Sequence, residues 1–311
     1  MSTLNRPAAT DQALTFSRRR LLSVSGGALA AGLLAGAPVR AQMGSGDSYQ
    51  PQSGQAGKDV IWVPTPDELV TRMLQLGGVT KHDFVMDLGA GDGKIVIAAA
   101  KQFGARGLGL EYNPEMVALA QRLAREAGVA DKAKFEKADI FESDFSKADV
   151  ITMYLLPSLN LKLRPTLMQL KPGTRLVTHA FTMGGWQPDE TSRARGASAY
   201  LWLVPANVSG RWRLSYPQGG RRTQVMVDVT RQHFQFPQGS VALGEAESSL
   251  RDARVMGDRV RFAFTGTDGV LRTFHGKVSG ARIEGQVSDG RRSDAFTAER
   301  QGEAGRIETS D

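Results

Sequence analysis

Two kinds of hydrophobic pattern alternate along the chain from about residue 60 to residue 207. Short apolar runs have the composition of buried strands, and longer segments between them carry apolar residues three and four positions apart, as amphipathic helices do. The predicted strands are Phe84–Leu88, Gly107–Glu111, Lys134–Glu136, Val150–Leu155 and Arg175–Ala180, and the predicted helices are Asp67–Leu76, Gly93–Phe103, Pro114–Ala127 and Leu159–Leu170. This alternation predicts an α/β fold, with a parallel sheet and helices on both of its faces.

The pattern changes after residue 207. Alternation with a period of two replaces the helical periodicity, and turn dipeptides such as Asp268-Gly269 and Ser279-Gly280 separate the runs. The predicted strands are Arg211–Tyr216, Gln224–Phe236, Arg259–Thr265, Leu271–Val278 and Arg282–Val287. Residues 208–311 are therefore expected to form a small all-β domain, such as a meander. Gly210-Arg211-Trp212 at the start of its first strand resembles the entry of small lipocalin-like barrels, which is the alternative. This domain could bind a ligand, recruit a substrate or pack against the preceding domain.

The N-terminal region has the pattern of an export signal. Arg18, Arg19 and Arg20 precede an apolar run rich in Gly and Ala, and Val39-Arg40-Ala41 follows it. Consecutive arginines before such a run resemble a twin-arginine (Tat) signal, with cleavage after Ala41. We expect residues 1–41 to direct the protein through the Tat export machinery to the periplasm. A Sec signal, an uncleaved anchor and a cytosolic extension are the alternatives. The Gly-rich run is a poor membrane span, so we expect no stable span after cleavage.

The net charge of the whole chain is a poor guide to its binding partner. The 311 residues carry a net charge of +7, which by itself suggests nucleic acid. Residues 1–41, however, hold five arginines and one aspartate, which leaves 34 basic and 31 acidic residues in the rest of the chain. These basic residues form no cluster with aromatic side chains, so no nucleic-acid partner is expected. Residues 42–58 are rich in Gly, Ser and Gln, and are predicted to be a flexible linker.

Cysteine and histidine counts limit the chemistry. The absence of Cys excludes disulfides, a cysteine nucleophile and a thiolate metal site. With only four His residues, no metal site is expected.

A glycine-rich turn follows the strand that ends in Asp87 and Leu88. Its spacing is Gly89, Gly91 and Gly93, whereas the dinucleotide fingerprint G-x-G-x-x-G would require its third glycine at the position of Lys94. Glycines let a ligand approach the main chain closely. An acid just before the turn disfavours a diphosphate and suits a ligand with a sulfonium and an amino-acid group.

Two more acids follow the next strands. Glu111 ends the second predicted strand, and Asp139 follows the third. The carboxyl ends of parallel strands meet at one edge of the sheet, so Asp87, Glu111 and Asp139 should converge on one cleft. A carboxylate at Glu111 can accept from both ribose hydroxyls, and Asp139 can accept from an adenine amino group. Asp139 could instead be a helix cap.

These motifs resemble those of the class I S-adenosylmethionine-dependent methyltransferases over residues 60–205. The segments that carry the resemblance are DLGAGDGK (Asp87–Lys94), the strand end at Glu111 and KADI (Lys137–Ile140). Trp62–Pro66 and Tyr154–Pro157 are similar to a smaller branch, which includes mitochondrial protein-lysine methyltransferases and their bacterial relatives. The resemblance implies a Rossmann-like domain, here residues 59–207, and the cofactor S-adenosyl-L-methionine.

In the terms of this family, the cofactor would contact residues at three strand ends. Gly89, Gly91 and Gly93 would line its methionyl part beside Asp87, Glu111 would bind ribose, and Asp139 would bind adenine.

The acceptor is expected near the end of the fourth strand. In this superfamily the residues there face the methyl group, and Met153–Asn160 lacks the Asn/Asp-Pro-Pro-aromatic motif of base-methylating enzymes. Tyr154 is the candidate for the acceptor pocket, and His179 is the candidate general base. Each could instead be structural. Bacterial relatives often have Asp where Ala180 stands here, and Thr65-Pro66 is expected to cap the first helix or to contact the cofactor.

The sequence thus predicts methyl transfer to a protein lysine or a small-molecule amine. The alternative is an exported module that binds a nucleoside-like ligand without catalysis, because S-adenosylmethionine is made in the cytosol. A dehydrogenase that uses NAD is a third hypothesis, disfavoured by Lys94.

Overall fold

The computed structural model describes residues 49–59, 61–194 and 196–310, and these residues form one compact unit. The predicted signal peptide, residues 1–41, lies outside the described residues. Within the described part, no helix combines the length and the apolar character needed to cross a bilayer.

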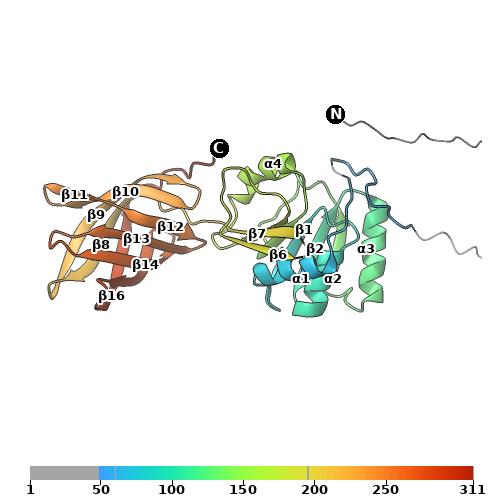
Figure 1. Ribbon diagram of the computed structural model, residues 1–311, viewed down its shortest axis with the longest axis horizontal. Helices are drawn as coiled ribbons and strands as arrows, with labels where there is room; N and C mark the ends of the chain where they lie inside the picture. The colour runs from blue at the N-terminus through green and yellow to red at the C-terminus, as the bar shows by residue number, and fades with distance from the viewer. Residues whose placement is uncertain (1–48, 60, 195, 311) are drawn as a thin grey trace, which may run out of the picture. The chain divides into compact units, whose positions relative to one another are not determined.

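The first domain contains a seven-stranded sheet in the order β3-β2-β1-β4-β5-β7-β6 (Figure 1). Its strands are β1 (Phe84–Leu88), β2 (Arg106–Glu111), β3 (Ala133–Lys137), β4 (Val150–Met153), β5 (Arg175–His179), β6 (Glu190–Ala194) and β7 (Ala197–Leu203). The first five are parallel, as predicted. Two strands that the sequence did not predict make the sheet mixed, because β6 and β7 form an antiparallel hairpin that pairs with β5 at one edge.

Helices cover both faces of this sheet. They are α1 (Asp67–Leu76), α2 (Lys94–Phe103), α3 (Pro114–Glu126) and α4 (Pro157–Leu167). Successive strand residues point to opposite faces: Val85 packs in the core with α1 and α2, and Met86 in the core with α4. Asn113 caps α3 by accepting from the Glu115 N–H at 2.8 Å, with Pro114 in the first turn. This arrangement leaves the carboxyl ends of β1–β4 free for a ligand.

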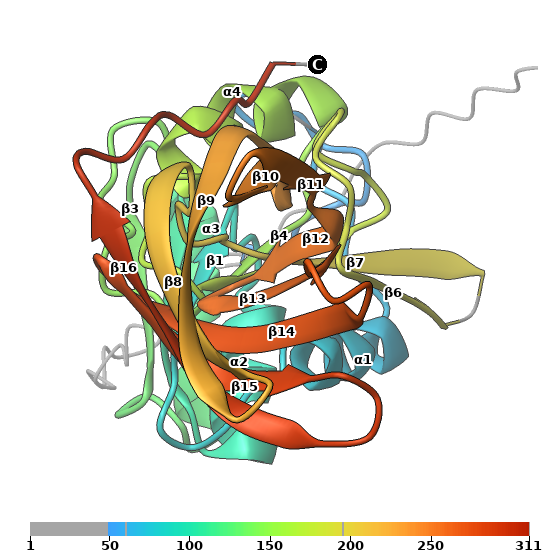
Figure 2. The ribbon, with the colours of Figure 1, turned by 90° about the vertical axis from the view of Figure 1, so that its left-hand side faces the viewer.

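The second domain is a nearly closed barrel of nine antiparallel strands in the order β11-β10-β9-β8-β16-β15-β14-β13-β12 (Figure 2). The strands are β8 (Gly210–Gln218), β9 (Arg221–His233), β10 (Phe236–Leu243), β11 (Ala246–Ser249), β12 (Arg251–Met256), β13 (Arg259–Thr265), β14 (Leu271–Ser279), β15 (Arg282–Ser288) and β16 (Ser293–Gln301). Both predicted turns are present, between β13 and β14 and between β14 and β15. Stacked Phe262 and Phe274 fill the interior, where a gap of about 20 Å³ remains.

The two domains share buried contacts. Phe234, directly after β9, stacks on Trp186, with ring centroids 5.8 Å apart and planes 2° from parallel. Arg254 on β12 forms an ion pair of 2.8 Å with Asp189, whose side chain is only 1% exposed. Gln235 Nε2 also donates to the Gln187 carbonyl at 2.7 Å. The barrel is therefore packed against the sheet domain by apolar, ionic and hydrogen-bonded contacts.

Candidate active site

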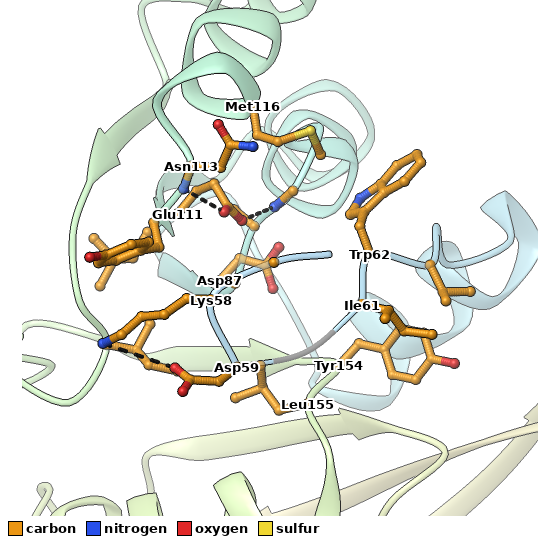
Figure 3. A pocket seen from close by; sticks show the side chains of 18 of the residues that line it. Lys58, Asp59, Ile61, Trp62, Asp87, Glu111, Asn113, Met116, Tyr154 and Leu155 are labelled. Atoms are coloured by element: carbon orange, nitrogen blue, oxygen red, sulfur yellow. Dashed lines mark hydrogen bonds and ion pairs between the residues drawn. The ribbon is translucent and has the colours of Figure 1, made fainter. Parts of the chain in front are cut away.

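A cavity of about 290 Å³ lies at the carboxyl ends of β1, β2 and β4 (Figure 3). This volume is at the lower end of the range for small-molecule sites, roughly 300–1,000 Å³. The residues predicted from the motifs that line it are Asp87, Gly89, Gly91, Glu111, Asp139 and Tyr154. Residues that lie far apart in the sequence thus meet in one cavity, and the predicted convergence of the three acids is present.

The three glycines of the turn have different roles. All three have left-handed backbones, with φ of +78° at Gly89, +55° at Gly91 and +80° at Gly93. Gly89 and Gly91 line the cavity, and a Cβ at Gly91 would lie 2.6 Å from Trp62 Nε1. Gly93 is not among the lining residues, and a Cβ there would lie 2.5 Å from the Phe135 ring. Gly93 therefore serves the close packing of the start of α2 on β3.

Glu111 is held by backbone groups on both sides. Its Oε2 accepts from the Gly91 N–H and its Oε1 from the Asn113 N–H, both at 2.9 Å (Figure 3). These bonds orient the carboxylate, and each oxygen retains a second lone pair. The geometry suits a ligand that presents two neighbouring hydroxyls, as ribose does.

Asp87 makes the floor of the cavity acidic. Its side chain is buried, and the Thr152 hydroxyl donates to Oδ1 at 2.6 Å. Burial, with a smaller contribution from the charges of Asp92 and Glu111, raises the pKa of Asp87 to about 7. A cation beside Asp87 would relieve this electrostatic cost, so the donor set fits a ligand that carries a sulfonium and an ammonium.

Asp139 is already engaged by a residue that precedes the domain. Lys58 donates to its Oδ2, and the Phe141 N–H donates to its Oδ1 at 2.9 Å. The hydrogen bond from Lys58 is the main reason that the pKa of Asp139 is lowered. Lys58 Nζ also lies 4.8 Å from the centroid of the Tyr112 ring. Residues 55–58, within the range expected to be a linker, line the cavity instead.

The rings of Tyr154 and His179 are in contact, with their planes tilted by 31°, but only Tyr154 lines the cavity. Their ring centroids are 3.8 Å apart, and His179 is not among the lining residues. Burial lowers the pKa of His179 to about 4, so the ring is neutral at neutral pH and a weak acceptor for a proton from an ammonium. His179 therefore lies behind Tyr154, one layer away from any ligand.

Thr65 and Asn160 do not cap helices. The residue before α1 is Pro66 with no side-chain capping bond, and the Thr65 hydroxyl lies 3.2 Å from His179 Nδ1. Asn160 lies inside α4, where its Nδ2 donates to the Thr182 carbonyl at 3.2 Å. The expectation that Thr65 caps the first helix is therefore not met. Its sequence neighbours gave no sign of a partner 114 positions away.

The sequence did not reveal several residues that line the cavity. They include Lys58, Tyr112 and Met116. Lys58 lies in a stretch without hydrophobic periodicity, and only its charge could have suggested an acidic partner. Among the described residues, no group of three or more His, Asp or Glu side chains could hold a metal ion.

Comparisons with known proteins identify the family. The model of the ANTKMT methyltransferase domain matches residues 87–190. A protein-lysine N-methyltransferase of Saccharolobus islandicus is 41% identical over 151 residues, which are 47% of this chain and 94% of that protein. An adenine nucleotide translocase lysine N-methyltransferase of Mus musculus is 35% identical over 106 residues, 33% of this chain and 46% of that protein, so the match spans about half of its length.

A solved structure is also similar. An RNA methyltransferase from Salinibacter ruber, crystallised with S-adenosyl-L-homocysteine, is 52% identical, with a TM-score of 0.46; the match covers 47% of this chain and 96% of that one. None of these matches extends over the whole chain. The relative from Saccharolobus islandicus is nonetheless matched over nearly its entire length. The chain therefore belongs to the class I S-adenosylmethionine-dependent methyltransferases, in the branch of protein-lysine methyltransferases that contains the ANTKMT domain.

Proposed function

We propose that this enzyme methylates lysine side chains of proteins. The observation that carries the proposal is the likeness to a protein-lysine N-methyltransferase matched over 94% of its length. The acceptor end of the cavity is consistent with it. The cavity wall includes apolar and aromatic side chains, namely Trp62, Val63, Tyr154, Leu156 and Phe181. The segment Met153–Asn160 contains no base-methylating motif.

The lining residues divide into two ends. In the view of Figure 3, Lys58, Asp59 and Glu111 lie on one side of Asp87, and Ile61, Trp62 and Tyr154 lie on the other. We assign adenosine to the side of Glu111 and Asp139, and the methionyl group to Asp87, Gly89 and Gly91. The reactive carbon then lies toward Tyr154.

When bound, the cofactor supplies a methyl group on sulfur: the acceptor nitrogen forms the new N–C bond while the C–S bond breaks and leaves its electron pair on sulfur. The lysine must arrive as a neutral amine, having lost a proton to water. Apolar walls disfavour a charged ammonium and thereby lower the pKa of an amine between them. Orientation of the amine toward the methyl group supplies much of the remaining acceleration.

The test is radiolabelled methyl transfer into a fractionated lysate, followed by complete hydrolysis and identification of the labelled amino acid. The expected product is methylated lysine, formed by the wild type and lost in Glu111→Ala. Label in RNA or in a small molecule would contradict the protein-lysine proposal. Binding of S-adenosylhomocysteine without transfer to any fraction would support the non-catalytic alternative for this chain.

We propose in addition that the enzyme works in the periplasm after Tat export. The support is the run Ser17–Leu22 with its three arginines and the Val39-Arg40-Ala41 sequence. A folded protein can carry bound cofactor through this route. Conversion of Arg18 and Arg19 to Lys should leave the precursor in the cytoplasm, as measured by cell fractionation. Unchanged export of the double variant would contradict the twin-arginine assignment.

A further inference from the structure

Thr65 joins the cavity to a buried histidine. It lies directly before Pro66 and α1, is only 7% exposed, and lines the cavity with Tyr154. Its backbone is fixed from one side, because Lys94 Nζ donates to the Thr65 carbonyl at 3.2 Å. Its hydroxyl is fixed from the other side by His179 Nδ1, at 3.2 Å. A threonine with no capping role therefore presents an oriented hydroxyl at the cavity wall.

The backbone directly after His179 is strained. The Phe181 N–H donates to the His179 carbonyl at 2.8 Å, closing a three-residue turn around Ala180. Ala180 has a φ of +63°, a left-handed conformation that is unfavourable for a residue with a Cβ atom. Such strain is concentrated at functional sites. The turn ends at Phe181, which itself lines the cavity and lies 6.2 Å from the Tyr154 ring.

The protonation state of His179 decides what the Thr65 hydroxyl can do. Burial lowers the pKa of His179 to about 4, so the imidazole is neutral. A neutral imidazole has one nitrogen that donates and one that accepts. When Nδ1 accepts from the Thr65 hydroxyl, both lone pairs of Oγ1 are free to accept from a donor in the cavity. His179 can thus make Thr65 an acceptor that faces the ligand.

We propose that Thr65 accepts a hydrogen bond from the amine that receives the methyl group, and that His179 is the positioning residue that orients the Thr65 hydroxyl. This inference rests on the proposed function, because it assumes an amine acceptor. A nucleophilic amine must direct its lone pair along the methyl–sulfur axis, so its N–H bonds need acceptors elsewhere. Thr65 provides one beside the Tyr154 ring. The bond can persist after transfer, because the methylated nitrogen still carries N–H groups.

The experiment uses two cofactor analogues in which nitrogen replaces the sulfur. One carries an aminoethyl arm, whose terminal amine lies one carbon beyond the position of the methyl group, where the acceptor nitrogen approaches. The other carries a propyl arm of equal length without the amine. Isothermal titration gives the ratio of the two dissociation constants, which reports on recognition of the amine. Because both analogues contain the same adenosyl and amino-acid parts, the ratio is insensitive to changes at the cofactor end.

Thr65→Val keeps the shape of the side chain but removes the oxygen, so it should lower the preference for the aminoethyl arm by about tenfold, the effect of one hydrogen bond. Thr65→Ser should retain the preference, and Thr65→Ala should lose it like the valine variant. S-adenosylhomocysteine should bind all three variants as it binds the wild type. An unchanged preference in Thr65→Val and Thr65→Ala would overturn the proposal.

The role of His179 is tested by variants that keep or remove a hydrogen-bond acceptor near the position of its Nδ1. An asparagine side chain can place an acceptor near the Nδ1 position, so His179→Asn should retain part of the preference and His179→Phe should lose it. The double variant Thr65→Val/His179→Phe should lose no more than Thr65→Val alone, since His179 acts through Thr65. Additive losses would contradict this. If the lysate test yields methyllysine and the Thr65 variants keep their preference, the inference fails and the proposed function stands.

Discussion

At the scale of the residue, the fold fixes the orientation of the Glu111 carboxylate before any ligand binds. Each of its two carboxylate oxygens accepts from a backbone N–H, one in the glycine turn and one at the start of α3. Backbone groups cannot adjust independently of the fold, so the direction of the remaining lone pairs is fixed. Preorganisation of this kind reduces the free-energy cost of ordering the site on binding.

Replacement of Glu111 by Gln should weaken S-adenosylhomocysteine binding by about 10- to 100-fold, since hydrogen bonds to a charged acceptor contribute roughly 1.5–3 kcal/mol. A Gln side chain has one acceptor oxygen, whereas both carboxylate oxygens of Glu111 accept hydrogen bonds from backbone N–H groups. Isothermal titration measures the effect. Glu115→Gln, on the exposed first turn of α3, is the matched control and should bind like the wild type. Equal affinity of the two variants would show that Glu111 does not contact the ligand.

Asp87 should make cofactor binding depend on pH. Its pKa is raised to about 7, so it is largely protonated at pH 6 and largely ionised at pH 8. A sulfonium favours the ionised form, so S-adenosylmethionine should release a proton on binding near neutral pH and bind more tightly as pH rises. S-adenosylhomocysteine lacks that charge and should show a shallower dependence. Titrations of both ligands from pH 5.5 to 8.5 test this, and Asp87→Asn should flatten the difference. Parallel curves in the wild type would contradict the assignment.

At the scale of elements, the segment before α1 lines the cavity together with the strand ends of the sheet. Within this segment, the Gly54 N–H donates to the Trp62 carbonyl and the Trp62 N–H donates to the Gln55 carbonyl. Lys58 connects the segment to the sheet domain through an ion pair with Asp139. The carboxylate that we assign to adenine thus has an intramolecular partner. Cofactor that binds Asp139 must compete with this ion pair.

Lys58→Met should therefore tighten S-adenosylhomocysteine binding by up to about fivefold, because exposed ion pairs are worth roughly 0–1 kcal/mol. The effect should shrink at high salt, which weakens the pair in the wild type. Lys101→Met, in the last turn of α2, is the control. Weaker binding by Lys58→Met would mean that Lys58 contacts the cofactor rather than competing with it.

The sequence allowed most elements of the first domain to be predicted, because each carries its own local signal. The strands β1 to β5 and the four helices were anticipated within a few residues, and so were Asp87, Glu111 and Asp139 at the strand ends. The hairpin β6–β7 was missed, since the stretch Glu190–Ala194 is mostly exposed and has no apolar alternation. The Thr65–His179 contact could not be predicted, because it depends on how the start of α1 packs against the end of β5.

At the scale of the whole molecule, the barrel is coupled to the catalytic domain through a shared core. Phe234 is fully buried in the same cluster as Trp186, Trp202 and Leu176 of the sheet domain. The predicted boundary near residue 207 is therefore a change of secondary structure, while the apolar core continues across it. Cooperative unfolding of both domains is the expected consequence.

Phe234→Ala should lower the free energy of unfolding by about 3–5 kcal/mol, the usual range for a buried Phe. Calorimetry of the wild type should show one transition, and the variant should unfold at a lower temperature or in two steps. Leu271→Ala, at an exposed site in the barrel, is the control. Two separate transitions in the wild type would show that the domains are energetically independent.

The contact between Trp62 and Gly91 has one further consequence. Trp186, Trp202 and Trp212 are almost completely buried in the two cores, whereas Trp62 is partly exposed and forms part of the cavity wall. Of the chain's four indoles, Trp62 is thus the one whose surroundings change directly when a ligand fills the cavity. The protein carries its own fluorophore at the binding site, so occupancy can be followed optically and in real time without a label.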